Sequence, residues 1–283
     1  MDIIEYIVTH NTKLNFLKNS LQFLVGASMV YALGQHSDYT KLILPLVGLV
    51  LAYQSVYRLN DIFDFSEDSK NQFKRNLKPF ARGETSLETE VSKMFLYMLL
   101  GLSISFYVST LFGLLVTAML ILNFFHSYKP LNIKRTPIGI VNIFLIEFIK
   151  FSCGWFALGG NFQSFPYFIT AFMSSAYALG YHSYKNDLNM RAVQKKRFMI
   201  LFAATSIFYL LSIFIYKEFR ISMVAMLPAF ILLFLVKSGK SGIQKIITGA
   251  PVVVGVMAAV VVLNFLLPYE PIHSINIWLG NLF

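Results

Sequence analysis

Long apolar stretches dominate the pattern along this chain, and short polar segments separate them. Nine of these stretches are each near the roughly 20 residues that an α-helix needs to cross a bilayer. We expect them at residues 18–35, 40–59, 92–109, 112–127, 137–158, 165–184, 198–216, 220–237 and 246–267. The pattern therefore predicts an all-α bundle of nine transmembrane helices, forming a single domain over residues 1–283.

The composition favours a membrane protein. Of the 283 residues, 56% are hydrophobic and only 13% are charged, and the mean hydropathy is +0.61. Soluble domains carry roughly 25% charged residues. A single soluble core cannot bury this much apolar surface, whereas a bilayer can accommodate it. The one cysteine, Cys153, excludes an intrachain disulfide framework.

Basic residues are distributed unequally between the predicted loops. If the N-terminus and the loops after the even-numbered spans share one face, that face holds 20 of the 24 Lys and Arg residues. Only Lys41, Lys217 and Arg220 fall on the opposite face, and Lys150 lies within a span. Because Lys and Arg are retained on the cytoplasmic side, we expect a cytoplasmic N-terminus in a multi-pass cell-membrane protein. Topology thus accounts for the formal net charge of +10, and no nucleic-acid partner is expected.

The stretch NDIFDFSEDSKNQFKRNLKP at residues 60–79 concentrates acids. Asn60, Asp64 and Asp68 follow the spacing i, i+4, i+8, which places them on one face of a helix, and Asp61 can join that face. Carboxylates crowded on a helix face repel each other unless a cation lies between them. Mg²⁺ suits such oxygen ligands, since it uses one or two carboxylates and completes its shell with waters and substrate phosphates. The alternative is a solvated segment of mixed charge.

Bases follow the acids in the same stretch. Lys74, Arg75 and Lys78 are the residue types that bind an anionic polyphosphate. Each of them could equally be an ordinary anchor that fixes topology.

Here the residues resemble a known family. Asn60-Asp61-x-x-Asp64-x-x-x-Asp68 is similar to the NDxxDxxxD motif of the UbiA superfamily of intramembrane prenyltransferases. Nine spans with the catalytic loops on the cytoplasmic face is also the arrangement of that superfamily. The resemblance therefore covers essentially the whole chain.

Two further segments extend the resemblance beyond the first motif. Lys74-Arg75, Lys78-Pro79 and Gly83 are similar to the family's K-R, R-P and G, with lysine in place of the arginine before proline. The segment from Tyr128-Lys129-Pro130 to Lys134-Arg135 resembles the family's Y-S-x-P and L-K-R.

The resemblance implies an Mg²⁺-dependent enzyme that transfers a prenyl group from a polyprenyl diphosphate. The acceptor would be an aromatic or other lipid precursor, as in quinone biosynthesis. In the family, Mg²⁺ bridges the diphosphate to the Asp-rich motifs, the prenyl tail lies in a lipid-facing cleft, and ionisation of the C–O bond gives an allylic cation that the acceptor attacks. Metal and Lys or Arg side chains aimed at the leaving diphosphate stabilise its developing charge.

The resemblance also implies roles for individual residues. The metal candidates are Asn60, Asp61, Asp64 and Asp68. The catalytic candidates are Asp64, Asp68 and Asp187. The substrate-binding candidates are Lys74, Arg75, Lys78, Tyr128, Lys134, Arg135, Tyr181, Lys185 and Asn186. The two tyrosines are included because an aromatic face stabilises a cation, although aromatic residues are also common interfacial anchors.

The second Asp-rich motif of the superfamily is incomplete in this chain. Asn186-Asp187 matches the start of N/K-D-x-x-D-x-x-x-D, but Met190 and Gln194 stand where acids are expected. An alignment that starts at Lys185 also loses two charges. The bases that follow are Arg191, Lys195, Lys196 and Arg197. We therefore hypothesise that the first motif binds one Mg²⁺, while this basic segment neutralises part of the diphosphate.

That departure leaves other functions open. A polyprenyl-phosphate phosphoribosyltransferase of the same superfamily retains the first motif and has basic residues in the second loop. A membrane terpene cyclase ionises the same donor without an acceptor. A non-catalytic membrane protein, such as a transporter, is the remaining alternative. Glu147 and Lys150, spaced i, i+3 within the fifth predicted span, are either a structural pair or part of a site.

Overall fold

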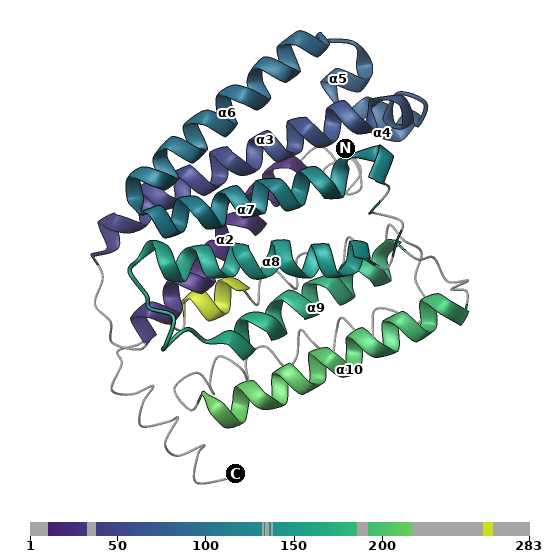
Figure 1. Ribbon diagram of the computed structural model, residues 1–283. Helices are drawn as coiled ribbons and strands as arrows, with labels where there is room; N and C mark the ends of the chain where they lie inside the picture. The colour runs from purple at the N-terminus through teal and green to yellow at the C-terminus, as the bar shows by residue number, and fades with distance from the viewer. Residues whose placement is uncertain are drawn as a thin grey trace. The chain divides into compact units, whose positions relative to one another are not determined.

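The computed structural model describes residues 11–32, 38–131, 133, 136, 138–185, 192–216 and 257–262, and these ranges contain helices and no strand. Figure 1 shows long helices joined by short connections. The long helices are α2 (Asn11–Ala32), α3 (Ile43–Asp68), α6 (Leu87–Val108), α7 (Thr110–Ser127), α8 (Ile138–Ala157), α9 (Tyr167–Lys185) and α10 (Ala192–Ile215). The short ones are η1 (Tyr39–Leu42), α4 (Gln72–Leu77), α5 (Pro79–Arg82) and η2 (Lys129–Leu131).

The all-helical prediction is confirmed for the ranges above. Within them, five helices are long and apolar enough to cross a membrane: Thr40–Asp68, Leu87–Val108, Thr110–Ser127, Ile138–Ala157 and Phe198–Ile215. The predicted spans at 18–35 and 165–184 correspond to α2 and α9. The predicted span 220–237 lies outside the described residues, and of 246–267 only residues 257–262 are described, as helix. The count of nine spans and the cytoplasmic N-terminus stay predictions.

The break between α6 and α7 is a single residue. Ser109 has an extended backbone, with φ −167° and ψ 153°, and its side chain accepts a hydrogen bond of 3.1 Å from the backbone N–H of Phe112. A serine in this conformation caps the N-terminus of the following helix. The predicted spans 92–109 and 112–127 are therefore two separate helices, α6 and α7, with Ser109 alone between them.

Two compact units make up the chain. The first comprises Met1–Ser20 and Tyr39–Ile149, and the second comprises Leu21–Asp38 and Lys150–Phe283. In the first unit α3, α6 and α7 pack against one another, and α4 and α5 lie at the end of α3 from which the chain continues towards α6 (Figure 1). The acidic stretch is thus located at one end of a three-helix group.

Glycines allow α3 and α6 to approach closely. A Cβ atom on Gly101 of α6 would lie 2.4 Å from the backbone nitrogen of Ala52 in α3. A Cβ atom on Gly48 of α3 would lie 2.9 Å from Cγ2 of Ile104. Small residues at helix contacts are the usual means of close packing inside a membrane, where apolar surface gains little from leaving lipid.

The second unit contains an even closer approach. A Cβ atom on Gly26 would lie 1.9 Å from the carbonyl oxygen of Phe151, and one on Gly154 would lie 1.9 Å from the carbonyl oxygen of Phe23. These reciprocal contacts join α2 to the C-terminal part of α8. In the same unit α9 packs on α10, where the rings of Phe172 and Tyr209 have centroids 5.0 Å apart.

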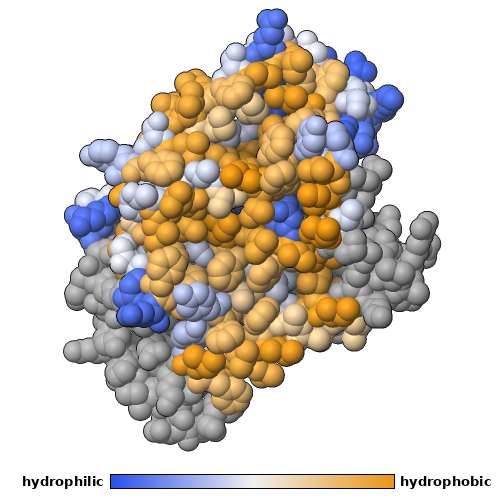
Figure 2. All heavy atoms as spheres, in the orientation of Figure 1, coloured by the Kyte–Doolittle hydropathy of each residue, from blue (hydrophilic) through white to orange (hydrophobic). Residues whose placement is uncertain are grey.

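Apolar side chains cover much of the surface. Figure 2 shows hydrophobic residues over α6 and α7, while hydrophilic residues gather where Figure 1 places α4 and α5. Leu99 and Tyr107 of α6 are 59% and 82% exposed. Such a continuous apolar surface is typical of helices that face lipid.

Candidate active site

The four predicted metal ligands lie in the last turns of α3. No glycine or proline occurs between Leu49 and Lys78, so nothing in the sequence ends the helix at residue 59, and α3 continues to Asp68. The predicted helical register of the motif is therefore confirmed. Asn60, Asp61 and Asp64 are partly exposed, whereas the side chain of Asp68 is only 1% exposed.

Lys78 forms ion pairs with two of these acids. Its Nζ lies 2.7 Å from Oδ1 of Asp61 and 2.6 Å from Oδ2 of Asp68. Burial by itself would lower the pKa of Lys78, but the charges and hydrogen bonds of Asp61 and Asp68 outweigh burial and raise this pKa above its ordinary value. Lys78 is consequently a fixed cation at neutral pH.

The short helix α5 positions Lys78. The residue before a proline is driven towards extended backbone, and Lys78, which precedes Pro79, has φ −113° and ψ 113°. Gly83 ends α5 with φ +80°, a conformation that favours glycine. The ring of Phe80 lies 4.7 Å from that of Phe65 in α3, measured between centroids. Local backbone chemistry and an aromatic contact thus dock this segment on α3.

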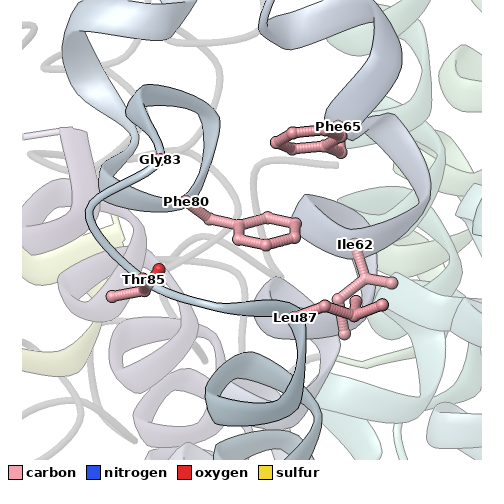
Figure 3. Close-up of a pocket in the computed structure, with 6 residues that line it drawn as sticks. All are labelled: Ile62, Phe65, Phe80, Gly83, Thr85 and Leu87. Atoms are coloured by element: carbon pink, nitrogen blue, oxygen red, sulfur yellow. The ribbon is translucent and has the colours of Figure 1, made fainter.

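A cavity of about 460 Å³ adjoins this aromatic contact. Figure 3 shows that α3 contributes Ile62 and Phe65, and α5 contributes Phe80. The connection to α6 contributes Gly83 and Thr85, and Leu87 is the first residue of α6. The complete lining is Ile62, Phe65, Phe80, Gly83, Thr85 and Leu87. It carries no charged side chain, so the charged groups of α3 lie beside this cavity and do not line it.

The C-terminal end of α7 contacts the other side of the motif. The buried hydroxyl of Ser127 donates a hydrogen bond to Oδ1 of Asn60. Tyr128, which follows α7, stacks on Phe124 with centroids 5.3 Å apart and contacts Phe63 of α3 edge-on at 5.7 Å. Asn60 is therefore held in place from α7, and Tyr128 lies next to the helix that carries the acids.

Lys129 brings the following segment to the same end of α3. Its Nζ donates a hydrogen bond of 3.2 Å to Oγ of Ser66 and lies 3.6 Å from Oε1 of Glu67. The two segments that the sequence singled out in the first unit, residues 74–83 and 128–130, thus both contact the last turns of α3.

A further ion cluster joins α3 to α6. Glu90 of α6 is 1% exposed, and its carboxylate lies 3.0 Å from Nη1 of Arg58 and 3.2 Å from Nζ of Lys93. Arg58 precedes Asp61 by one helical turn, so its charge acts on that acid. This cluster fixes α3 against α6 directly beside the motif.

The other predicted site residues are placed only in part. Lys74 and the exposed Arg75 belong to α4, and Tyr181 and Lys185 belong to the last turns of α9. The remaining four, Lys134, Arg135, Asn186 and Asp187, lie outside the described residues. In the second unit, Lys150 is buried with its Nζ 5.9 Å from the ring centroid of Tyr177.

Three residues in contact with the motif or beside it were not predicted from the sequence. In the sequence, nothing distinguishes Ser127 from other small residues at helix ends. Its hydrogen bond to Asn60 joins residues 67 positions apart in the chain. Arg58 is one of the 20 bases counted on one face, and Glu90 has no part in the sequence analysis. Their one visible signal is that each interrupts or adjoins an apolar stretch, where a charge usually has a buried partner.

The donor set fits a magnesium ion that shares its shell with a substrate. Within the described ranges, no group of three or more His, Cys, Asp or Glu side chains forms a metal cage. Mg²⁺ at phosphate-binding sites typically takes only one or two carboxylates from the protein. Asn60 and Asp64 lie one turn apart and are both partly exposed, and the amide oxygen of Asn60 keeps a second lone pair beside its bond to Ser127.

Comparisons with known proteins show the family and the fold of this chain. The model of the UbiA prenyltransferase family matches residues 21–271. A UbiA homolog from Archaeoglobus fulgidus, solved bound to GPP and Mg²⁺, has 15% identity and a TM-score of 0.64, over 90% of this chain and 99% of that chain. The apo structure of a UbiA homolog from Aeropyrum pernix K1 has 13% identity and a TM-score of 0.63, over 92% and 99%. No curated protein sequence matches. At these identities the solved structures show a shared fold.

Proposed function

Because the chain belongs to the UbiA prenyltransferase family, we propose that it transfers a prenyl group from a polyprenyl diphosphate to an aromatic or other lipid-precursor acceptor, with Mg²⁺ as cofactor. Two solved structures of the Archaeoglobus fulgidus homolog support the donor and the metal, since one is bound to GPP and Mg²⁺ and the other to DMAPP and Mg²⁺. Acceptors of the kind used in quinone biosynthesis suit this reaction.

Asn60 and Asp64 are the proposed protein ligands of the metal. Their oxygens share one stripe of α3, and both side chains are partly exposed, so a hydrated ion and a diphosphate can reach them. When bound, Mg²⁺ would neutralise charge that develops on the leaving diphosphate. Ser127 orients the Asn60 amide, and the ion pairs of α3 hold the backbone of the motif in place.

The surrounding bases are the proposed diphosphate contacts. Lys74 and Arg75 lie in α4, directly after the acidic turns of α3, and Lys129 contacts the same end of α3. Basic side chains near a leaving diphosphate stabilise the charge that forms there. We extend this role to Lys134, Arg135, Lys185 and Asn186, with Asp187 as the one acid of the second motif and Tyr128 and Tyr181 as aromatic contacts. These segments face the cytoplasm in the proposed topology, and residues 1–283 act as one domain.

The observation that carries the proposal is the partly exposed pair Asn60 and Asp64 at one end of α3, in a chain that matches the family over residues 21–271. The test is an assay of the detergent-solubilised protein with Mg²⁺ and a labelled prenyl diphosphate, against a panel of aromatic acceptors. A parallel reaction supplies phosphoribosyl diphosphate and polyprenyl phosphate. Prenylated acceptor supports the proposal. Pentosylated lipid, or a cyclised hydrocarbon formed without acceptor, would contradict it.

A further inference from the structure

We propose that Lys78 is the built-in counter-cation of Asp61 and Asp68, so that these two acids position the site and do not bind metal. The inference deepens the proposed function and rests on it only in taking Asn60 and Asp64 as the metal ligands. It divides the four polar residues of the motif into two pairs with different partners.

Helix geometry lets one cation bind Asp61 and Asp68 together. Asp61 and Asp68 are two turns apart and differ by about 20° around the helix axis, so one group can bind both. Lys78 does so, with contacts of 2.7 and 2.6 Å. Asp64 lies about 40° around the helix from both Asn60 and Asp68, so the contacts of Lys78, and not the helix register, distinguish the two pairs. Ser127 of α7 contacts Asn60.

Burial separates the two pairs further. Mg²⁺ gives up its waters reluctantly and keeps several of them in protein sites. Asp68 is 1% exposed and has no room for hydrated metal, yet a buried carboxylate needs a positive partner. Lys78 supplies that charge from within the fold.

The positive charges around Asp61 also disfavour metal binding by this acid. Arg58, one turn earlier, acts on Asp61 with a positive charge, and Lys78 acts from the other side. A divalent cation on Asp61 would therefore face two fixed cations at short range, where like charges repel strongly.

The position of Lys78 does not depend on the ion pairs alone. Pro79, the left-handed Gly83 and the contact between Phe80 and Phe65 all fix the same segment on α3. The pairing thereby holds the connection that follows α3, which includes α4 and α5, against α3. Lys78 is accordingly a positioning residue.

Direct binding of Mn²⁺, counted by electron paramagnetic resonance on the full chain in detergent, tests the assignment without any activity measurement. We expect Asp68→Asn to bind Mn²⁺ within about threefold of the wild-type affinity, since only a neighbouring charge changes. Asp64→Asn should weaken binding by about tenfold or more, because it loses a ligand. Glu84→Gln, an exposed acid paired with Arg82, is the matched control. Equal losses in Asp68→Asn and Asp64→Asn would overturn the proposal.

A second arm removes the counter-cation. Lys78→Ala should bind one additional Mn²⁺ per chain, and adding Asp68→Asn to it should remove that ion. Lys129→Ala, which removes a lysine from the other side of α3, should add none. If Lys78→Ala does not fold, Lys78→Gln replaces it in the same measurement of bound Mn²⁺. If neither Lys78 variant gains an ion, and Asp68→Asn does not restore their stability, the proposal is wrong. Wild-type protein that binds no Mn²⁺, with or without added inorganic pyrophosphate, would instead contradict the metal site at Asn60 and Asp64, and the Lys78 variants would still test the role of Lys78.

Discussion

Arg58 of α3 and Glu90 of α6 form an ion pair of 3.0 Å between helices that the chain separates by 32 positions. Glu90 is almost completely buried and also pairs with Lys93, so one carboxylate holds two cations at the end of the helix pair. Because Arg58 lies one turn before Asp61, this contact sets how α3 presents its acidic turns.

Replacing Glu90 by glutamine should destabilise the first unit. The change leaves Arg58 and Lys93 without their shared anion, and we expect a loss of about 2 kcal/mol, below the full value for a buried pair because both cations are partly exposed. Thermal unfolding in detergent measures this loss. Glu88→Gln, an exposed acid in the same first turn of α6, is the control. Equal melting temperatures for the two variants would contradict the role of Glu90.

The helix contact in the second unit should tolerate no side chain at Gly154. A Cβ atom there would lie 1.9 Å from the carbonyl oxygen of Phe23, and backbone cannot move aside as a flexible side chain does. Gly154→Ala should cost about 2 kcal/mol or more by forcing α2 and α8 apart. Val141→Ala, on an exposed position of α8, should change the melting temperature little. A Gly154→Ala protein as stable as wild type would show that the two helices are not in contact there.

Removing the hydroxyl of Ser127 should weaken Mg²⁺ binding more than it lowers the stability of the fold. Without its donor the Asn60 amide can rotate away, and one hydrogen bond of about 1 kcal/mol corresponds to about a fivefold change in an equilibrium. We expect Ser127→Ala to raise the Mg²⁺ concentration for half-maximal prenyl transfer by about that factor. Ser92→Ala, at an exposed position of α6, should leave it unchanged. A fall in the melting temperature with no change in Mg²⁺ dependence would assign Ser127 a purely structural role.

The sequence predicted the helices of the described ranges because their signals are local. Long apolar runs give helices that suit a bilayer, and the spacing of Asn60, Asp64 and Asp68 gives one helix face. The proline after Lys78 and the glycine at position 83 are local signals too. They favour the extended backbone of Lys78 and the left-handed backbone of Gly83.

Partners distant in the chain were beyond prediction. Periodicity places Asp61 and Asp68 on α3, but it cannot show that the fold brings Lys78 to both. Nor does it show that Ser127 contacts Asn60, or that Gly26 and Gly154 meet backbone of the opposite helix. Such contacts depend on how helices pack, which a one-dimensional pattern does not contain.

We propose that prenyl transfer depends on Asp64, whose partly exposed side chain lies one turn from that of Asn60 near the end of α3. The most direct measurement is the rate of Mg²⁺-dependent transfer from a labelled prenyl diphosphate by wild type, Asp64→Asn and the control Glu84→Gln, each checked for equal thermal stability. We expect Asp64→Asn to lower the rate by about 100-fold or more and Glu84→Gln to keep it, because Asp64, unlike Glu84, is a proposed ligand of the Mg²⁺ that stabilises the leaving diphosphate. An Asp64→Asn protein with the wild-type rate would contradict this proposal.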